Sequence, residues 1–413
     1  MSEWKKVKLG DYIDVLSGFA FKSKDFSDSG IPVIKIKNVC PPYISLEDLS
    51  YVPNSIAFQN PRYILRKGDV LIAMTGSHIN QIASVVGRVG RVRYDAITVL
   101  NQRVGKIVNK NEAKSSLDYI YYYLSQYEVK VELAQKAGGA ANQANISPSD
   151  IKNLLFPYPP IGIQHRIATI LSRYDSLIEN YQKQIKLLEE AAQRLYKEWF
   201  VDLRFPGHEN TKIVDGVPEG WEIKSITNNH LFDVAKCRIA LFNGNKTYYA
   251  TADVEGTYFC NSGVKIEYDN KPSRAQIQPS LYSVWFARMS NSFKIVGFVE
   301  QNNNRREDSI LSSGFAGFES HYERFGFLYC LISSQWFNDQ KDRYATGATQ
   351  VSITNEGLSR IRCLLPTTRL AEEFSLVTNK IIEETILYRE NCTMLTEARD
   401  RLLPKLMSGE IEI

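Results

Sequence analysis

The chain has 413 residues, of which 44% are hydrophobic and 23% charged, which is enough apolar material for two or three globular domains. No run of about 18 apolar residues occurs and no apolar segment follows the first lysines, so we expect neither a membrane span nor a signal peptide and predict a cytoplasmic protein. A net charge of +4 permits nucleic-acid binding without requiring it.

The first part of the chain alternates short β-rich runs with turns. The runs IPVIKIKNV (31–39), DVLIAMTG (69–76) and VVGRVGRVRY (85–94) are separated by Gly, Asn and Pro. These features predict a β-rich mixed domain over residues 1–160.

A long helix is predicted next, over residues 161–201. From Gln164 to about Phe200 the chain has no Gly or Pro and is rich in helix formers. Alternating steps of three and four select a mostly apolar seam, typical of paired helices. Its members are Ile167, Ile170, Tyr174, Leu177, Tyr181, Gln184, Leu188, Ala191 and Leu195.

The segment 202–220 is rich in Pro, Gly and charge, which indicates a linker. A second mixed domain is predicted over residues 221–367, with β-rich runs at 283–290 and 293–300. A second long helix is predicted over residues 368–413.

The two helices share one register, because Phe374 lies 207 residues after Ile167 and the same offset relates two whole seams. The second seam consists of Phe374, Val377, Ile381, Glu384, Tyr388, Asn391, Leu395, Ala398 and Leu402. Gln184 and Asn391 occupy the same seam position, where an amide costs stability but fixes alignment. We favour pairing of the two helices, parallel or antiparallel. The alternative is that each packs on its own domain.

Other landmarks recur in the same order. They are Trp4 and Leu9 with Trp221 and Ile226, the aromatic runs 118–126 and 324–335, the loops GAANQANIS (139–147) and GATQVSIT (347–354), and the proline-ended strands 154–160 and 363–368. We therefore predict an α+β fold with a pseudo-twofold internal repeat. In it, two β-rich mixed domains are separated by two long helices that form a coiled coil.

Local phrases add a resemblance to a known family. GFAFKSKDF, GIPVIKIKNV, GDVLIAMTGS and TVLNQRVGKI resemble one class of target recognition domain, and YATADVEG with KPSRAQIQP resembles another. With the repeat, nearly the whole chain resembles the specificity subunit of a type I restriction-modification system.

The resemblance implies antiparallel helices that hold two target recognition domains apart and dock two methyltransferase subunits, which restriction subunits join. S-adenosylmethionine would belong to the methyltransferase subunits and ATP with Mg to the restriction subunits, so no cofactor is expected in this chain. A helix over 164–200 would be about 55 Å long, which implies a bipartite double-stranded DNA target with an unread spacer.

Base reading uses Arg or Lys for guanine and Asn or Gln for adenine, carried on loops. The base-reading candidates of the first domain are Ser77, His78, Asn80, Gln81, Asn101, Gln102, Arg103, Gln143 and Asn145. Those of the second are Arg274, Arg288, Asn291, Asn303, Arg305, Arg306 and Gln350. The phosphate candidates are Lys35, Lys37, Arg88, Arg91 and Arg93. Each could instead be a solvated loop residue or a turn cap, and Gln143 and Gln350 could anchor the strand before each helix.

We expect no catalysis in this chain. The fragment CPPY (40–43) resembles a methyltransferase motif, but Cys40 stands where that motif needs a polar acceptor. No glycine-rich turn for S-adenosylmethionine and no phosphate loop occur. The six cysteines are interpreted as buried hydrophobic residues, and no metal site is expected. The alternative function is a coiled-coil scaffold that joins two domains binding ligands other than DNA.

Overall fold

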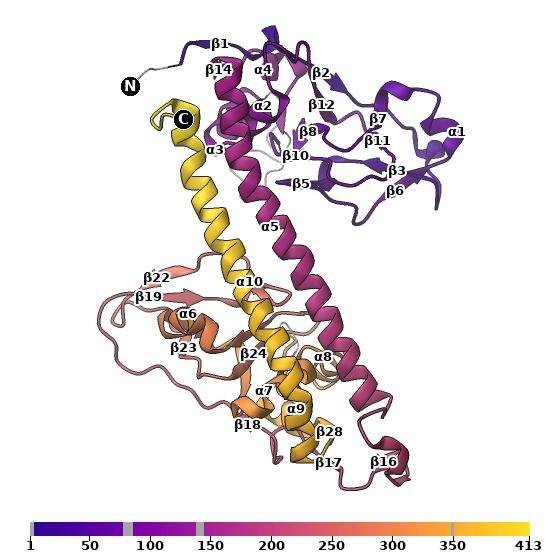
Figure 1. Ribbon diagram of the computed structural model, residues 1–413, viewed down its shortest axis with the longest axis vertical. Helices are drawn as coiled ribbons and strands as arrows, with labels where there is room; N and C mark the ends of the chain where they lie inside the picture. The colour runs from indigo at the N-terminus through magenta and orange to yellow at the C-terminus, as the bar shows by residue number, and fades with distance from the viewer. Residues whose placement is uncertain (1–3, 77–85, 138–143, 348–350) are drawn as a thin grey trace. The chain divides into compact units, whose positions relative to one another are not determined.

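The protein is described by a computed structural model that covers residues 4–76, 86–137, 144–347 and 351–413. The chain divides into two compact units, which we call unit 1 (Met1–Ser176 with Leu395–Ile413) and unit 2 (Leu177–Met394). Each unit combines a mixed domain with part of the long helices α5 (Ile161–Tyr196) and α10 (Thr368–Ser408) (Figure 1). In the described residues, no helix is both long and apolar enough to cross a membrane.

Unit 1 is built on two sheets. The larger has the order β2 (Ile13–Ser17), β12 (Val104–Asn109), β8 (Val70–Ala73), β10 (Val89–Arg91), β5 (Tyr43–Ile44), β4 (Val39–Cys40). The smaller has the order β6 (Ser50–Val52), β3 (Ile31–Ile34), β11 (Thr98–Leu100), β7 (Ile64–Leu65). Every residue of β8 is buried, which explains its uninterrupted apolar sequence VLIA.

Short helices cover the sheets of unit 1. They are α2 (Leu117–Leu124), α3 (Tyr127–Lys136) and α4 (Pro148–Lys152). Ser116 caps α2 by accepting a hydrogen bond from the Tyr119 N–H. The same core contains Leu403, Leu406 and Met407 of α10, so the end of that helix belongs to unit 1.

Unit 2 repeats this topology, with four strands in place of six in the first sheet. Its sheets have the orders β18 (Asp233–Val234), β27 (Phe315–Glu319), β24 (Ser283–Ala287), β25 (Ile295–Phe298) and β22 (Val264–Ile266), β19 (Lys246–Tyr249), β26 (Ser309–Ser312), β23 (Ala275–Ile277). In each unit the second sheet contains one parallel pair, β3 with β11 or β19 with β26. A strand pair also precedes each long helix: β1 (Lys6–Lys8) with β14 (Leu155–Pro157), and β17 (Glu222–Ser225) with β28 (Arg362–Leu365). The predicted α+β class and internal repeat are confirmed.

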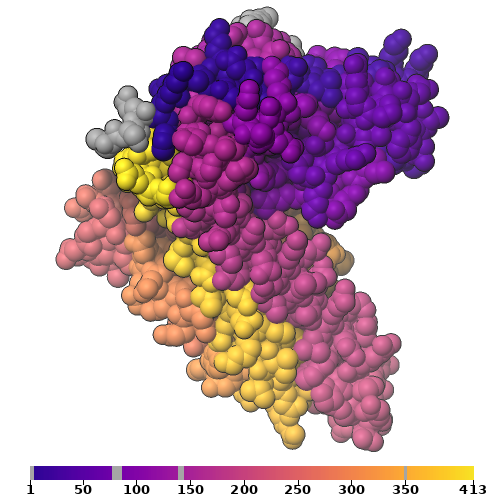
Figure 2. Space-filling model, turned by 45° about the horizontal axis from the view of Figure 1, so that its top comes forward, coloured from indigo at the N-terminus to yellow at the C-terminus, as the bar shows by residue number. Residues whose placement is uncertain are grey.

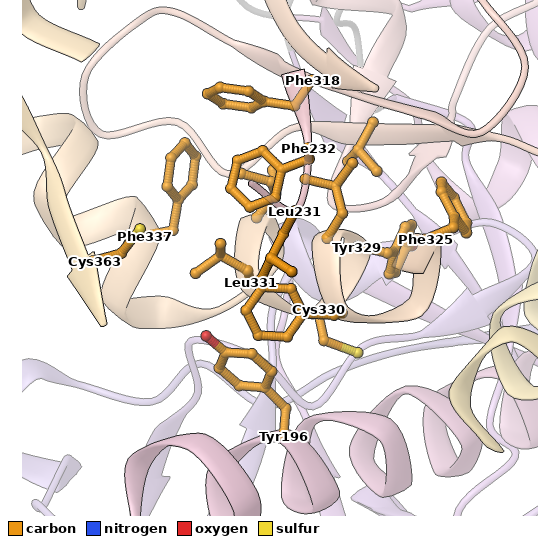
Figure 3. Packing of buried hydrophobic residues seen from close by; sticks show 14 of the residues in the cluster. Tyr196, Leu231, Phe232, Phe318, Phe325, Tyr329, Cys330, Leu331, Phe337 and Cys363 are labelled. Atoms are coloured by element: carbon orange, nitrogen blue, oxygen red, sulfur yellow. The ribbon is translucent and has the colours of Figure 1, made fainter. Parts of the chain in front are cut away.

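The core of unit 2 joins α5 to the buried helix α7 (Tyr322–Ile332). Figure 3 shows Tyr196 of α5 beside Cys330 and Leu331 of α7, with Phe232 and then Phe318 above them in that view. α7 crosses α10 closely, since a Cβ on Gly326 would lie 2.2 Å from Thr378 Oγ1. The other helices of unit 2 are α6 (Asn303–Asp308), α8 (Gln335–Arg343) and α9 (Asn355–Arg360). After Tyr196 the chain makes a π-helical turn, Lys197–Val201.

The two long helices pair antiparallel within each unit (Figure 1). In unit 1, Arg399 Nη1 lies 2.7 Å from Asp175 Oδ1. In unit 2, the rings of Tyr181 and Tyr388 are 4.9 Å apart. The Cys392 thiol of unit 2 also donates to Ile178 O (3.8 Å), so residue numbers rise along one helix as they fall along its partner. This confirms the predicted pairing and the antiparallel sense that the resemblance implied.

The buried stripe lies one residue beyond the predicted seam in both helices. Its buried members are Ala168, Leu171, Asp175, Ile178, Ile185, Ala192 and Tyr196 on α5, and Ser375, Thr378, Ile382, Thr385 and Leu403 on α10. Of the predicted seam, Ile167 and Phe374 are buried, and Ile170, Tyr174, Tyr181, Gln184, Leu188, Leu195, Ile381, Tyr388, Asn391, Leu395 and Leu402 are half-buried. Ala191, Glu384 and Ala398 are exposed, as are Leu177 (47%) and Val377 (51%). Hydrophobic periodicity gives weight to large side chains, whereas the buried stripe also includes small ones, Ala168, Ala192 and Ser375, that permit close approach.

Candidate nucleic-acid interface

In unit 1, three segments converge where β8 ends. The Met74 N–H donates to Arg103 O (3.0 Å), and the Ile146 N–H donates to Met74 O (2.9 Å). The next residues form β9 (Thr75–Gly76), which pairs with β13 (Ala144–Asn145). The end of the central strand, the β11–β12 turn and residues 144–146, the described part of the first glycine-led loop, therefore meet at one edge.

Unit 2 builds the same junction where β24 ends. The Arg288 N–H donates to Gly314 O (2.9 Å), and the Ile353 N–H donates to Arg288 O (2.8 Å). An isolated bridge joins Met289 to Ser352. The echoed loops thus make equivalent backbone bonds, which gives a structural reason for their similarity.

The β11–β12 turn directs polar side chains outward in unit 1. The Gln102 N–H donates to Phe19 O (3.0 Å), and the Val104 N–H donates to Asn101 O (2.9 Å). Gln102 and Arg103 are exposed and Asn101 is half-buried. Asn145 is exposed on β13 of the same junction, so the structure brings these four base-reading candidates together. Ser77, His78, Asn80, Gln81 and Gln143 lie outside the described residues.

In unit 2 the corresponding edge contains the hairpin loop 288–293 between β24 and β25. Asn291 is exposed in this loop and has a positive φ of 54°. Arg274 is also exposed. Its guanidinium lies beside Gly314, since a Cβ added to that glycine would be 3.1 Å from Arg274 Nη2. Gln350 lies outside the described residues.

Arg305 faces the long helix α10. Its Nε and Nη2 donate to the Glu390 carboxylate at 2.5 and 2.8 Å, and Nη1 donates to Tyr249 Oη at 2.9 Å. Burial lowers the pKa of Arg305, but Glu390 and Tyr249 raise it by more than burial lowers it, so the net shift is upward. These bonds link the mixed domain to α10, and base reading by Arg305 stays a prediction.

Three other candidates of unit 2 have internal partners. Arg288 donates to Phe315 O (3.2 Å), Ile353 O (3.1 Å) and Asn355 Oδ1 (2.8 Å). Arg306 donates to Asn303 Oδ1 (2.8 Å), and Asn303 donates to Glu307 Oε1 (3.0 Å). Arg288, Arg306 and Asn303 therefore stabilise local backbone and helix α6.

The phosphate candidates are also largely paired within unit 1. Lys35 donates to Ser50 (2.8 Å) and lies 4.2 Å from the Phe26 ring centre, and Lys37 pairs with Asp48. Arg91 lies 2.8 Å from Asp118, and Arg93 lies 3.4 Å from Asp175. Arg88 is half-buried. The pKa of Lys130 is lowered mainly by the burial of Lys130 itself and also by the nearby positive charge of Arg88. Of these five candidates, only Lys37 is exposed.

Two buried charged groups that no sequence pattern indicates hold the mixed domains in place. The buried Asp175 accepts a hydrogen bond from Tyr122 (2.7 Å) besides its ion pair. The buried Lys341 donates to Met289 O (2.9 Å) and Ser292 O (2.5 Å). A single charged residue inside a helix-forming stretch carries no sequence signal that distinguishes it from a solvated one.

The described residues contain no group of three His, Cys, Asp or Glu side chains placed to hold a metal ion. In the CPPY segment, the exposed Cys40 thiol donates to Lys37 O (3.3 Å). At the two junctions the structure exposes polar side chains that can form hydrogen bonds. They are the amides of Gln102, Asn145 and Asn291 and the guanidinium groups of Arg103 and Arg274.

Comparison with known proteins shows which family this chain is similar to. Residues 1–190 match the family model described as the type I restriction modification DNA specificity domain. A putative type I restriction enzyme MjaX specificity subunit from Methanocaldococcus jannaschii is 24% identical, covering 100% of this chain and 94% of the relative. The chain is therefore similar over its full length to type I restriction enzyme specificity subunits. The MjaIX specificity subunit of the same organism is 26% identical over the same shares.

A solved structure of such a subunit has the same fold. The S subunit of a type I restriction-modification system from M. genitalium matches with a TM-score of 0.62 and 16% identity, over 98% of this chain and 96% of that chain. The resemblance inferred from sequence phrases and the repeat is thereby confirmed. The second half of the present chain lies outside the family-model match, which ends at residue 190, but inside the full-length matches.

Proposed function

We propose that the chain is the DNA sequence-specificity subunit of a type I restriction-modification complex. It would bind a bipartite duplex target, one half-site at each mixed domain. The observation that supports this best is the repeated junction, in which two units share backbone bonds but expose different side chains. One scaffold with unlike reading edges suits a target with two unlike halves.

Base reading is assigned first to the exposed candidates, Gln102, Arg103 and Asn145 in unit 1 and Arg274 and Asn291 in unit 2. Arg103 and Arg274 have the donors that recognise guanine, and the amides suit adenine. Ser77, His78, Asn80, Gln81, Gln143 and Gln350 remain candidates. The recognition domains in this proposal are residues 1–160 and 221–367, the spacer helices 161–201 and 368–413, and the linker 202–220.

The long helices would dock the partner subunits. Figure 2 shows α5 and α10 uncovered on one face of unit 2. On α10, Leu376 (79% exposed), Leu387 (39%) and Met394 (58%) lie on one side of the helix. Leu387 follows Leu376 by about three turns, and Met394 follows Leu387 by about two. An exposed apolar stripe of this kind supports docking of two methyltransferase subunits, which restriction subunits would join. S-adenosylmethionine, ATP and Mg would be held by these partners.

The decisive experiment measures adenine methylation in cells that carry the gene with its neighbouring methyltransferase gene. The expected result is methylation at one split motif, two short specified blocks around an unread gap, that disappears when the gene is deleted. If the co-expressed pair methylates no split motif and the purified complex binds no duplex DNA, the scaffold alternative replaces this proposal.

A further inference from the structure

Helix α8 packs against the hairpin loop 288–293 of unit 2 and donates hydrogen bonds to its backbone. The loop joins the antiparallel strands β24 and β25, and the Ala287 N–H donates to Lys294 O (2.9 Å) at its base. Met289 and Phe293 are 37% and 40% exposed, so the loop presents its side chains outward. Its backbone, in contrast, is tied down at several points.

Lys341 of α8 supplies the central tie. The residue is 2% exposed, and its ammonium donates to Met289 O (2.9 Å) and Ser292 O (2.5 Å), so one cation bridges the two sides of the loop. Burial lowers the pKa of Lys341, and the neighbouring Asp342 opposes that shift. Removing an ammonium from water is costly unless its donors are satisfied, so the loop carbonyls are required partners.

The next residue fixes the loop tip. Asp342 Oδ1 accepts the Asn291 N–H (3.1 Å) and lies 3.4 Å from Lys341 Nζ. Asn291 has a φ of 54°, a left-handed conformation that Asn tolerates better than most residues. Lys341 and Asp342 together therefore define both the width of the loop and the orientation of Asn291.

A second set of bonds ties the loop to the echoed segment. The Ser290 N–H donates to Val351 O (3.0 Å), and Arg288 donates to Ile353 O (3.1 Å). None of these bonds uses the Asn291 side chain. The loop is thus preorganised by groups that need not touch a ligand, which reduces the ordering cost of binding.

We propose that Lys341 and Asp342 are positioning residues that set the base preference of the half-site read by unit 2, by holding loop 288–293 with Asn291 facing outward. This inference rests on the proposed function. Neither residue contacts DNA in it. Their role is exerted through the loop backbone.

The test uses the full chain co-expressed with its methyltransferase, on a plasmid library with both half-sites randomised, and reads methylated adenines by sequencing. Lys341→Met keeps the volume and removes the donors, and Asp342→Ala removes the acceptor for Asn291. Each variant is expected to lower the preference at one or more positions of a single half-site by about tenfold, leaving the other half-site unchanged. Lys265→Met, whose side chain is 63% exposed in unit 2, is the matched control and should behave as wild type.

The wild-type sample reports the proposed function separately, since it must methylate a split motif before the variants are compared. Unchanged preferences at every position in both variants would overturn the inference, as would relaxation of both half-sites equally. Should Lys341→Met fail to assemble, Asp342→Ala decides. Failure of both to assemble would make the two residues structural only, and would also overturn it.

Discussion

At the residue scale, Asp175 is the most strongly buried charge in the helix seam. It is 1% exposed, with Arg399 at 2.7 Å and Arg93 at 3.4 Å. Asp175→Ala would remove the buried carboxylate that Arg93 and Arg399 share, although Arg399 keeps Asp400 at 2.7 Å. We therefore expect the free energy of unfolding of unit 1 to fall by about 3 kcal/mol. Urea denaturation of the full chain measures the change.

The matched control is Asp95→Ala, because Asp95 pairs with Lys67 at the surface and is 83% exposed. Its expected effect is about 0–1 kcal/mol. Equal losses in the two variants would show that burial does not strengthen the Asp175 pair.

Arg103 carries the prediction on base reading. It is exposed on the β11–β12 turn beside Gln102, and its guanidinium can recognise guanine with two hydrogen bonds. Arg103→Ala is expected to relax the methylation preference at one base pair of one half-site, by about 1–3 kcal/mol. Sequencing of methylated motifs measures this, with Lys67→Ala as the control. A uniform loss of affinity across all sequences would assign Arg103 to a phosphate instead.

At the element scale, the crossing of α7 and α10 depends on one glycine. A Cβ at Gly326 would lie 2.2 Å from Thr378 Oγ1 and 3.1 Å from Ser375 Cα, and both partners are buried. Gly326→Ala should therefore force the helices apart and destabilise unit 2 by about 1–3 kcal/mol, despite the better helix propensity of Ala. Thermal unfolding measures the effect.

Gly162→Ala is the control for this crossing. It lies near the start of α5, and among the described residues a Cβ there would meet nothing within 4 Å. That variant should be neutral or slightly stabilising, by about 0.4–1 kcal/mol. If Gly326→Ala were also stabilising, the close crossing would be contradicted.

Helix α2 should make unit 1 sensitive to alkali. Burial raises the pKa of Tyr121 from 10.0 to about 12, and it also raises the pKa values of Tyr119, Tyr122 and Tyr123. Below pH 10 both states keep these protons and the stability is fully present. Between pH 10 and about 12 the unfolded tyrosines ionise while the folded ones stay neutral, so stability is lost as pH rises.

Urea midpoints from pH 8 to 12, followed with tyrosinate absorbance, check this expectation. Tyr121→Phe should reduce the steepness of the loss by one titrating group. A midpoint that stays constant above pH 10 would contradict the assignment.

The elements could be predicted better than the contacts they make. Both long helices follow from stretches without breakers, and their shared register follows from the 207-residue offset. The buried stripe could not be placed, because Ala192, Ser375 and Thr378 contribute by being small, while hydrophobic periodicity weights Leu and Tyr. Arg305 likewise resembles any loop arginine until Glu390, 85 residues later, is brought against it.

At the scale of the whole molecule, the exposed apolar stripe of α10 should be required for assembly. Leu376→Lys with Leu387→Lys is expected to lower methyltransferase binding at least tenfold without changing the melting temperature, because both side chains already face solvent in the free chain. Co-purification and calorimetry measure this. The control is Leu241→Lys, at a loop position that is 74% exposed. Loss of binding in the control as well would point to a general effect of added charge.

The ion pairs of the helix seam favour pairing of α5 with α10 over pairing of α5 with the α5 helix of a second molecule. By the 207-residue offset, Arg399 corresponds to Ala192, and Arg389, which pairs with Glu189 at 2.6 Å, corresponds to Gln182. If two α5 helices from different molecules paired as α5 pairs with α10, Asp175 would lose Arg399 and Glu189 would lose Arg389. Self-association through one half of the duplication is thus disfavoured electrostatically, and the duplicated halves have become complementary to each other rather than to themselves.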